Sequence, residues 1–368
     1  MRGLFLARVA LVVPLLILLS AVAGGQERNS ESQPPQELRI PNRPSAPLFR
    51  GKGGKQRPEL HYDPSTHVVT LKLLVQDPNG YFIPNIRREN FAVYENGVRQ
   101  QNATVEVEQA PVSLALLMEF GGRTPGLNRD LGQEVSRAGQ QLLDELGRDD
   151  KIAVWKYSDK LEKLSDFSQG HDDLVTTFLT MGNPPLSDAD LFDAIVNLLP
   201  QLRPVAGRKA MVLVSSGIDS FSKAKFEDVI KIAQGADAPI YALSLAPALR
   251  QLMESQSHTV PKVQIDWSTA EKQIEQIAAA SGGRTYAPEN TIDLTPIYDD
   301  MLENLKIRYV IMYRSSTNAD PTLPRTVRVE LVNPKTGGPL KIVDSSGREI
   351  TARVIAQDKY VPGMASQQ

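Results

Sequence analysis

Five short and almost entirely apolar runs recur along the middle of the chain, and segments of helical periodicity separate them. A strand that is apolar on both faces belongs to a sheet that is covered on both sides, as in parallel sheets with crossover helices. The pattern therefore predicts an α/β fold with a doubly wound, mostly parallel sheet. The expected strands are residues 113–120, 151–158, 209–217, 239–247 and 284–288, and the expected helices are residues 127–146, 172–180, 189–202, 223–235, 269–281 and 291–305.

Strand patterns of a different, alternating kind flank this region on both sides. Before it come HVVTLKLLV and FAVYENGVRQ, the second with Asn96-Gly97 at a tight hairpin, and after it come KIRYVIMYR, RTVRVELV, LKIVDSS and EITARVI. Each set holds too few strands for a stable sandwich alone, so we expect the two sets to meet. A small β-sandwich domain would then comprise residues 61–110 and 306–361, with the α/β domain, residues 111–305, inserted into it.

The first 23 residues predict export. Arg2 and Arg8 accompany an apolar run from Val9 to Leu19, and Ala21-Val22-Ala23 follows as a cleavage site. The run is shorter than the roughly 20 residues that a spanning helix needs, so no membrane span is expected after cleavage. Residues 24–60 are rich in Gln, Pro, Ser and Gly and predict a disordered linker, and residues 362–368 predict a tail. The expected location is the periplasm or the medium.

Composition excludes several classes of site and partner. The chain has no cysteine, which rules out disulfides, thiolate metal sites, a Cys nucleophile and a lipidated Cys anchor. With 41 basic and 43 acidic residues, it has no excess of positive charge that would favour nucleic acid as a partner.

Motifs for catalysis are missing as well. The chain contains no G-x-S-x-G or H-E-x-x-H motif, and no pair of carboxylates stands out as an acid and base. His61 and His67 flank Asp63 and offer a zinc alternative, but residues at such spacing beside a linker are more often solvent-facing polar groups. We therefore expect no enzyme and no cofactor.

A series of short motifs resembles a known family. DPNGYFIPNIRRENFAVYENGVRQ is followed in order by LSDFS, ADLFDAIVNLL, KAMVLVSSGIDS, AAASGGRTYAP and LKIRYVIMYR. Over roughly residues 67–361 the chain is similar to von Willebrand factor A-related proteins of the acidobacterial type. The resemblance implies a von Willebrand factor A-like domain that mediates protein association. It also implies a metal-ion-dependent adhesion site at the carboxyl edge of the sheet, built from an Asp-x-Ser-x-Ser loop, a Thr and an Asp-Gly turn.

All three elements of that metal site depart from the family pattern. The first loop reads Glu119-Phe120-Gly121-Gly122-Arg123, the Thr position falls on about Ala189, and the turn reads Ser215-Ser216-Gly217. A guanidinium near the ion position would repel a divalent cation, so we expect a degenerate site without metal. The residues expected at this binding edge are Glu119, Gly121, Arg123, Asp188, Asp190, Ser216 and Asp219.

Several interpretations of the edge stay open. In one interpretation, Arg123 replaces the ion by pairing with Glu119, Asp188 or Asp190. In another, Arg123 and the acids form a solvent-exposed pair in a loop, which adds little to the stability of the fold. In a third interpretation, Asp188, Asp190 and Asp219 regroup into an atypical cation site. The insertion at residues 248–267, which holds Leu249 and Trp267, forms either a packed lid or a partner surface.

The function expected from these features is binding of another protein or peptide outside the cytoplasm. One alternative is a structural or assembly component of the bacterial envelope. Another is an enzyme with an unrecognised site.

Overall fold

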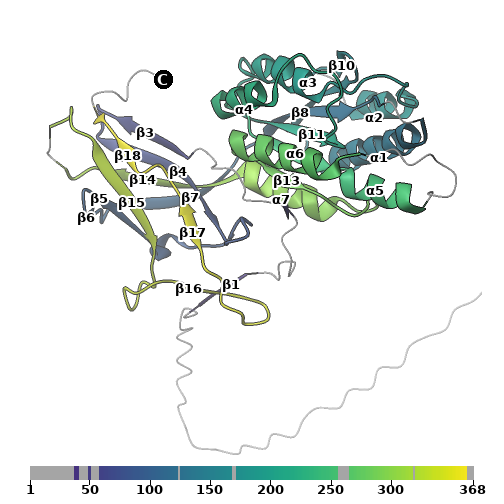
Figure 1. Cartoon of the computed structure of the whole chain (residues 1–368). Coiled ribbons are helices and arrows are strands. Elements are labelled where there is room, and N and C mark those ends of the chain that lie inside the picture. Colours follow the sequence, from purple (N-terminus) through teal and green to yellow (C-terminus); the bar gives the residue numbers. More distant parts are fainter. Residues whose placement is uncertain are drawn as a thin grey trace, which may run out of the picture. The chain divides into compact units, whose positions relative to one another are not determined.

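The computed structural model of the chain describes residues 37–40, 49–50, 58–122, 125–167, 171–255, 265–317 and 320–362. A seven-stranded sheet forms the centre of the α/β domain (Figure 1), with the strand order β10-β9-β8-β11-β12-β13-β2. Its parallel strands are β9 (Lys151–Tyr157), β8 (Val112–Glu119), β11 (Arg208–Ser215), β12 (Ile240–Ser244) and β13 (Arg284–Tyr286). β10 (Leu161–Ser165) and β2 (Phe49–Arg50) add antiparallel strands at the two edges.

Helices cover both faces of this sheet, because its strands are apolar on both sides. Leu116 of β8 belongs to a core under one layer of helices, and Leu117 belongs to a core under the other. The first layer holds α1 (Pro125–Asp144), α2 (His171–Thr180), α5 (Ala246–Ser255) and α7 (Thr295–Lys306). The second holds α3 (Leu191–Leu198), the 3-10 turn η2 (Leu199–Leu202), α4 (Phe226–Gly235) and α6 (Trp267–Ser281). The prediction of a doubly wound, mostly parallel sheet is confirmed.

Two further sheets draw on strands from both ends of the sequence. The first holds β3 (Glu59–Asp63), β4 (Val68–Gln76), β7 (Thr104–Gln109), β14 (Ile307–Arg314) and β17 (Arg353–Ile355). The second holds β5 (Phe91–Glu95), β6 (Val98–Arg99), β15 (Arg325–Leu331) and β18 (Lys359–Tyr360). β14 lies between β4 and β7, and β15 pairs with β5, so strands that precede the α/β region pair with strands that follow it.

The interior of these two sheets is shared. Leu71 and Ile311 from the first sheet and Val93 and Val327 from the second lie in one apolar cluster. The short 3-10 helix η1 (Arg88–Asn90) leads into β5, and β1 (Glu37–Ile40) pairs with β16 (Lys341–Asp344) as a separate two-stranded sheet. We call the part of the chain formed by these strands the β domain.

The hairpin between β5 and β6 has the geometry that its sequence demands. Asn96 has φ of 48° and Gly97 has φ of 81°, and both values lie in the left-handed region. A two-residue turn with positive φ at both positions matches the twist of the paired strands, and Asn-Gly is its favoured sequence. The predicted tight turn at Asn96-Gly97 is confirmed.

Three local predictions were wrong. The linker prediction for residues 24–60 fails at 37–40, 49–50 and 59–60, which form β1, β2 and the start of β3, because strands far along the chain supply pairing partners that local composition does not reveal. The rest of that range, apart from residue 58, lies outside the described residues. The strand expected at 239–247 ends at Ser244, and a helix that was not predicted, α5, begins at Ala246. The helix expected at 291–305 begins only at Thr295, and Ile292 before it is 77% exposed.

The predicted signal peptide, residues 1–23, lies outside the described residues. Within the part of the chain that the structure describes, no helix is both long and apolar enough to cross a membrane.

Candidate functional site

The strand order of the central sheet reverses between β8 and β11. β9 follows β8 along the chain and pairs on one side of it, whereas β11 pairs on the other side. After β8 the chain enters α1 on one face of the sheet, and after β11 it enters α4 on the opposite face. The two connections therefore separate and leave a crevice at the carboxyl ends of the strands, which is where open α/β sheets bind ligands.

Glu119, the last residue of β8, lies at the bottom of this crevice and is 3% exposed. Its carboxylate accepts hydrogen bonds from the Ser216 backbone amide at 2.6 Å and from the Ser215 and Ser216 hydroxyls at 2.8 Å. The Tyr157 hydroxyl from β9 lies 3.2 Å from Glu119 Oε2 and 2.8 Å from Ser215 Oγ. Neighbouring strands thus end in one continuous row of polar side chains.

Burial governs the protonation of Glu119 and Tyr157 in this row of polar side chains. It raises the pKa of Glu119, because the loss of solvation outweighs the hydrogen bonds from Ser216, Ser215 and Tyr157 that favour the charged form. Burial, with the Glu119 carboxylate beside it, also raises the pKa of Tyr157 well above its usual value. Tyr157 therefore stays a neutral hydroxyl.

The turn after β11 closes tightly around this carboxyl. Gly217 has φ of 85°, and a Cβ atom there would lie 2.8 Å from Ile274 Cδ1 and 2.9 Å from the Ala270 carbonyl oxygen. The Gly217 amide donates to Ser215 Oγ at 2.9 Å and the Ile218 amide to Ser216 Oγ at 3.2 Å. Both serines thus hold the turn as well as the carboxyl.

Two of the expected edge residues hold loops in place. Asp219 accepts hydrogen bonds from the Phe192 amide at 3.0 Å and from Ser222 Oγ at 2.6 Å, and Asp190 accepts one from the Phe221 amide at 3.1 Å. Burial raises the pKa of Asp190, and the nearby carboxylates Asp188, Asp219 and Asp193 raise it further.

Asp193 completes the same connection, although the sequence did not single it out. It accepts hydrogen bonds from the amides of Lys223 and Ala224 at 3.0 and 2.8 Å. Together these acids bind the start of α3 to the loop that follows β11.

Gly121 lies where the chain passes closest to the loop before α3. A Cβ atom at Gly121 would lie 2.5 Å from the Asp188 carbonyl oxygen and 2.6 Å from Ser187 Oγ, so this close approach requires glycine. The predicted role of Arg123 falls on a residue outside the described part of the chain. Of its three expected partners, Glu119 already accepts hydrogen bonds at both carboxylate oxygens.

The side-chain oxygens at this edge are poorly suited to coordinate a divalent cation. Ala189 has no side-chain oxygen at the expected Thr position, and both oxygens of Glu119 accept hydrogen bonds from hydroxyls. Among the described residues, no group of three or more His, Asp or Glu side chains is placed to share a metal ion. At the zinc alternative, His67 Nδ1 lies 2.8 Å from the Tyr62 hydroxyl, and Asp63 accepts from Ser65 and Thr66.

A pocket of about 360 Å³ opens above Glu119. Ser216, Asp219 and Ser220 line one side, and Leu249, Ile265 and Thr269 line another. The edge is therefore a concavity, and the two described ends of the insertion at 248–267 contribute to its wall. Leu249 is fully buried, and Met253, Ile265 and Trp267 pack against the same core, as a lid would.

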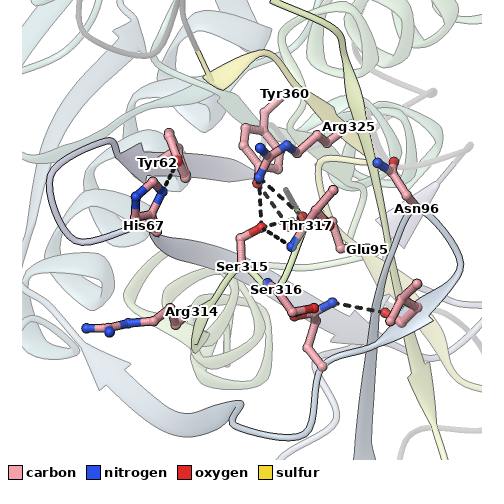
Figure 2. A network of polar contacts seen from close by, with 12 residues as sticks. Tyr62, His67, Glu95, Asn96, Arg314, Ser315, Ser316, Thr317, Arg325 and Tyr360 are labelled. Carbon is pink, nitrogen blue, oxygen red and sulfur yellow. Dashed lines mark hydrogen bonds and ion pairs between the residues drawn. The ribbon is translucent and has the colours of Figure 1, made fainter. Parts of the chain in front are cut away.

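A second buried carboxyl, Glu95, lies in the β domain and was not predicted as a site (Figure 2). It accepts hydrogen bonds from Ser315 Oγ at 2.5 Å and from the Tyr313 and Tyr360 hydroxyls at 2.8 and 2.9 Å. Arg325 forms an ion pair with it at 3.4 Å and donates to Ser315 Oγ at 2.7 Å.

No protein-family model matches the chain, and no curated protein matches it. Similar solved structures include an aerotolerance-related membrane protein from Bacteroides fragilis, with 11% identity and a TM-score of 0.40 over 52% of this chain and 99% of that one. The protein BatB from Bacteroides thetaiotaomicron has 12% identity and a TM-score of 0.39 over 52% and 97%.

A third similar structure is proximal thread matrix protein 1 from the mussel byssus, described with a zinc-occupied MIDAS motif. It has 13% identity and a TM-score of 0.41 over 56% of this chain and 49% of its own. The chain thus spans about half the length of this mussel protein. Likeness at these identities and TM-scores establishes neither a shared family nor a shared function.

Proposed function

We propose that the chain is an exported module that binds another protein or peptide in the pocket above Glu119. In this proposal it is a von Willebrand factor A-related protein with a degenerate metal-ion-dependent adhesion site, and it is not an enzyme. The observation that carries the proposal is the position of the pocket at the point where the strand order reverses. Export to the periplasm or the medium rests on the pattern of residues 1–23, and the chain recovered from outside the cytoplasm should begin at Gly24.

The surroundings of the pocket support a protein partner. Phe221 follows the lining residue Ser220 and is 63% exposed, and Leu186, which forms a β-bridge with Gly122, is 64% exposed. Large apolar side chains beside a concavity are typical anchors of protein interfaces. The buried acid at the bottom of the pocket accepts hydrogen bonds from Ser215 and Ser216, so these three side chains are already bonded to one another.

Two glutamines on the same helix give a matched test. Gln273 lines the pocket, whereas Gln276 is exposed one turn further along α6 and does not line it. Peptides selected from a random display library against the mature chain should bind Gln273→Arg about tenfold more weakly, because the longer, charged side chain enters the pocket. They should bind Gln276→Arg as they bind the native chain. Failure to select any peptide, or equal affinity for both variants, would overturn the proposal.

A further inference from the structure

The lining of the pocket combines an apolar wall with carboxylates. Leu131 of α1, Leu249 of α5 and Ile265 supply apolar surface, and Glu119, Asp219 and Asp266 supply carboxyl groups. None of the described residues that line the pocket is Lys, Arg or His. The pocket is thus acidic at its described surface.

The three carboxyl groups differ in how they are held. Glu119 is buried beneath the pocket, and burial raises its pKa, which disfavours its charge. Asp266 is exposed at the start of α6, and hydrogen bonds from Thr269 hold the pKa of Asp266 below its usual range. Asp219 is half-buried, and its Oδ1 accepts from the Phe192 amide and from Ser222 Oγ. Asp266 and Asp219 are therefore the groups that present charge to a ligand.

We infer that the pocket receives a lysine or arginine side chain of the partner, and this inference rests on the proposed function. A long basic side chain carries an aliphatic stem that suits the apolar wall and a cationic end that suits Asp219 and Asp266. An acidic side chain would meet two carboxylates, with no cation among the described lining residues, and would be repelled. In this arrangement the positive charge of the partner's side chain takes the place of the metal ion expected at an adhesion site of this kind.

The test uses the mature chain and the peptides whose binding is weakened by Gln273→Arg. Each should contain a Lys or Arg whose replacement by norleucine, which keeps an aliphatic stem and removes the charge, lowers affinity about tenfold. The affinity of the basic peptide should also fall as salt is raised, and that of the norleucine peptide should change less.

Two variants that remove a negative charge test which carboxylates bind the cationic side chain. Asp219→Asn and Asp266→Asn keep a side-chain oxygen for the Phe192 amide and for the start of α6, so both should fold. Each should weaken the basic peptide about fivefold and leave the norleucine peptide unchanged. Asp293→Asn is the matched control, because Asp293 accepts from the Thr295 amide near the start of α7 and does not line the pocket.

The outcomes separate the two proposals. In one outcome, some peptides would lose affinity for Gln273→Arg and yet keep it when their Lys or Arg is replaced by norleucine, or when both Asn variants are used. That result would overturn the inference of a basic side chain in the pocket and would leave the proposed peptide binding intact. Selection of acidic peptides at the same pocket would do so as well. If no peptide depends on Gln273, the proposed function fails and the inference fails with it.

Discussion

Glu119 and Glu95 are both buried carboxyl groups at the carboxyl end of a strand, yet their pKa values move in opposite directions. Burial raises the pKa of Glu119 despite its hydrogen bonds. At Glu95 burial also opposes the charge, but hydrogen bonds from Ser315, Thr317, Tyr313 and Tyr360 outweigh it, and the pKa is lowered. Both groups have hydroxyl donors, so the balance between these donors and the cost of burial decides the direction in which the pKa moves.

Two features distinguish the sites. Glu119 lies in the centre of a sheet that is covered by helices on both faces, whereas Glu95 lies in the smaller β domain. Glu95 also forms an ion pair with Arg325, whose side chain is 5% exposed. Among the described residues, no Lys or Arg forms an ion pair with Glu119. At Glu95 the four hydroxyl donors outweigh the cost of burial, whereas at Glu119 the cost of burial outweighs the donors.

The same substitution at both sites gives the largest expected difference. Glu95→Gln leaves Arg325 buried without its counter-charge and should lower the free energy of unfolding by about 3–5 kcal/mol. Glu119→Gln keeps the shape and most hydrogen-bonding capacity and should cost about 1 kcal/mol. Chemical denaturation of the two variants measures both values, and losses of equal size would contradict the comparison.

The pH dependence of the same variants should run in opposite directions. Because the folded pKa of Glu95 lies below its ordinary value of 4.5, its stabilisation is present above that pH and is lost as pH falls through the folded pKa. Because the folded pKa of Glu119 lies above 4.5, its contribution is full below that pH and is lost as pH rises through the folded pKa.

Denaturation between about pH 3 and pH 7 shows which direction holds. The penalty of Glu95→Gln should grow as pH rises, and the penalty of Glu119→Gln should shrink. A penalty that varies in the same direction at both sites would mean that burial does not control Glu119.

Replacement of Arg123 tests whether this cation pairs with the acids near Glu119. If Arg123 pairs with Asp188 or Asp190, Arg123→Ala should lower the melting temperature by about 2–4 °C, the shift expected for a loss of about 1 kcal/mol. Arg129→Ala, an exposed arginine of α1, is the control and should change little.

Metal should have the smallest effect of all. EDTA and Mg²⁺ should leave the melting temperature unchanged in the native chain and in Arg123→Ala. A calorimetric response to Mg²⁺ at millimolar or lower concentration would show that the edge binds a divalent cation and that Arg123 does not replace it.

The sequence was most informative where periodicity is strong. Apolar runs such as 209–217 predicted the inner strands, and the order of strands and helices predicted the edge where Glu119 and Ser216 meet. Periodicity did not reveal β1, β2 or α5, since β1 and β2 pair with strands distant in sequence and α5 follows its strand after a single residue.

The contacts between side chains were the feature that the sequence predicted least well. The contact of Tyr157 with Glu119 requires β9 to lie next to β8, and the role of Asp193 requires the loop after β11 to approach α3. The sequence showed that these residues are polar, but their contacts arise from chain segments that only the folded sheet brings together. For the same reason, Asp190 and Asp219 were expected to bind a partner, whereas both also hold loops.

The position of β14 between β4 and β7 has a consequence for how the chain acquires its structure. Glu106 of β7 pairs with Val310 of β14, so the entire α/β region must be synthesised before this sheet can close. Until then β4 and β7 expose unpaired edges, and pairings between such distant residues form slowly. A chaperone that binds these edges would protect them until β14 has been synthesised.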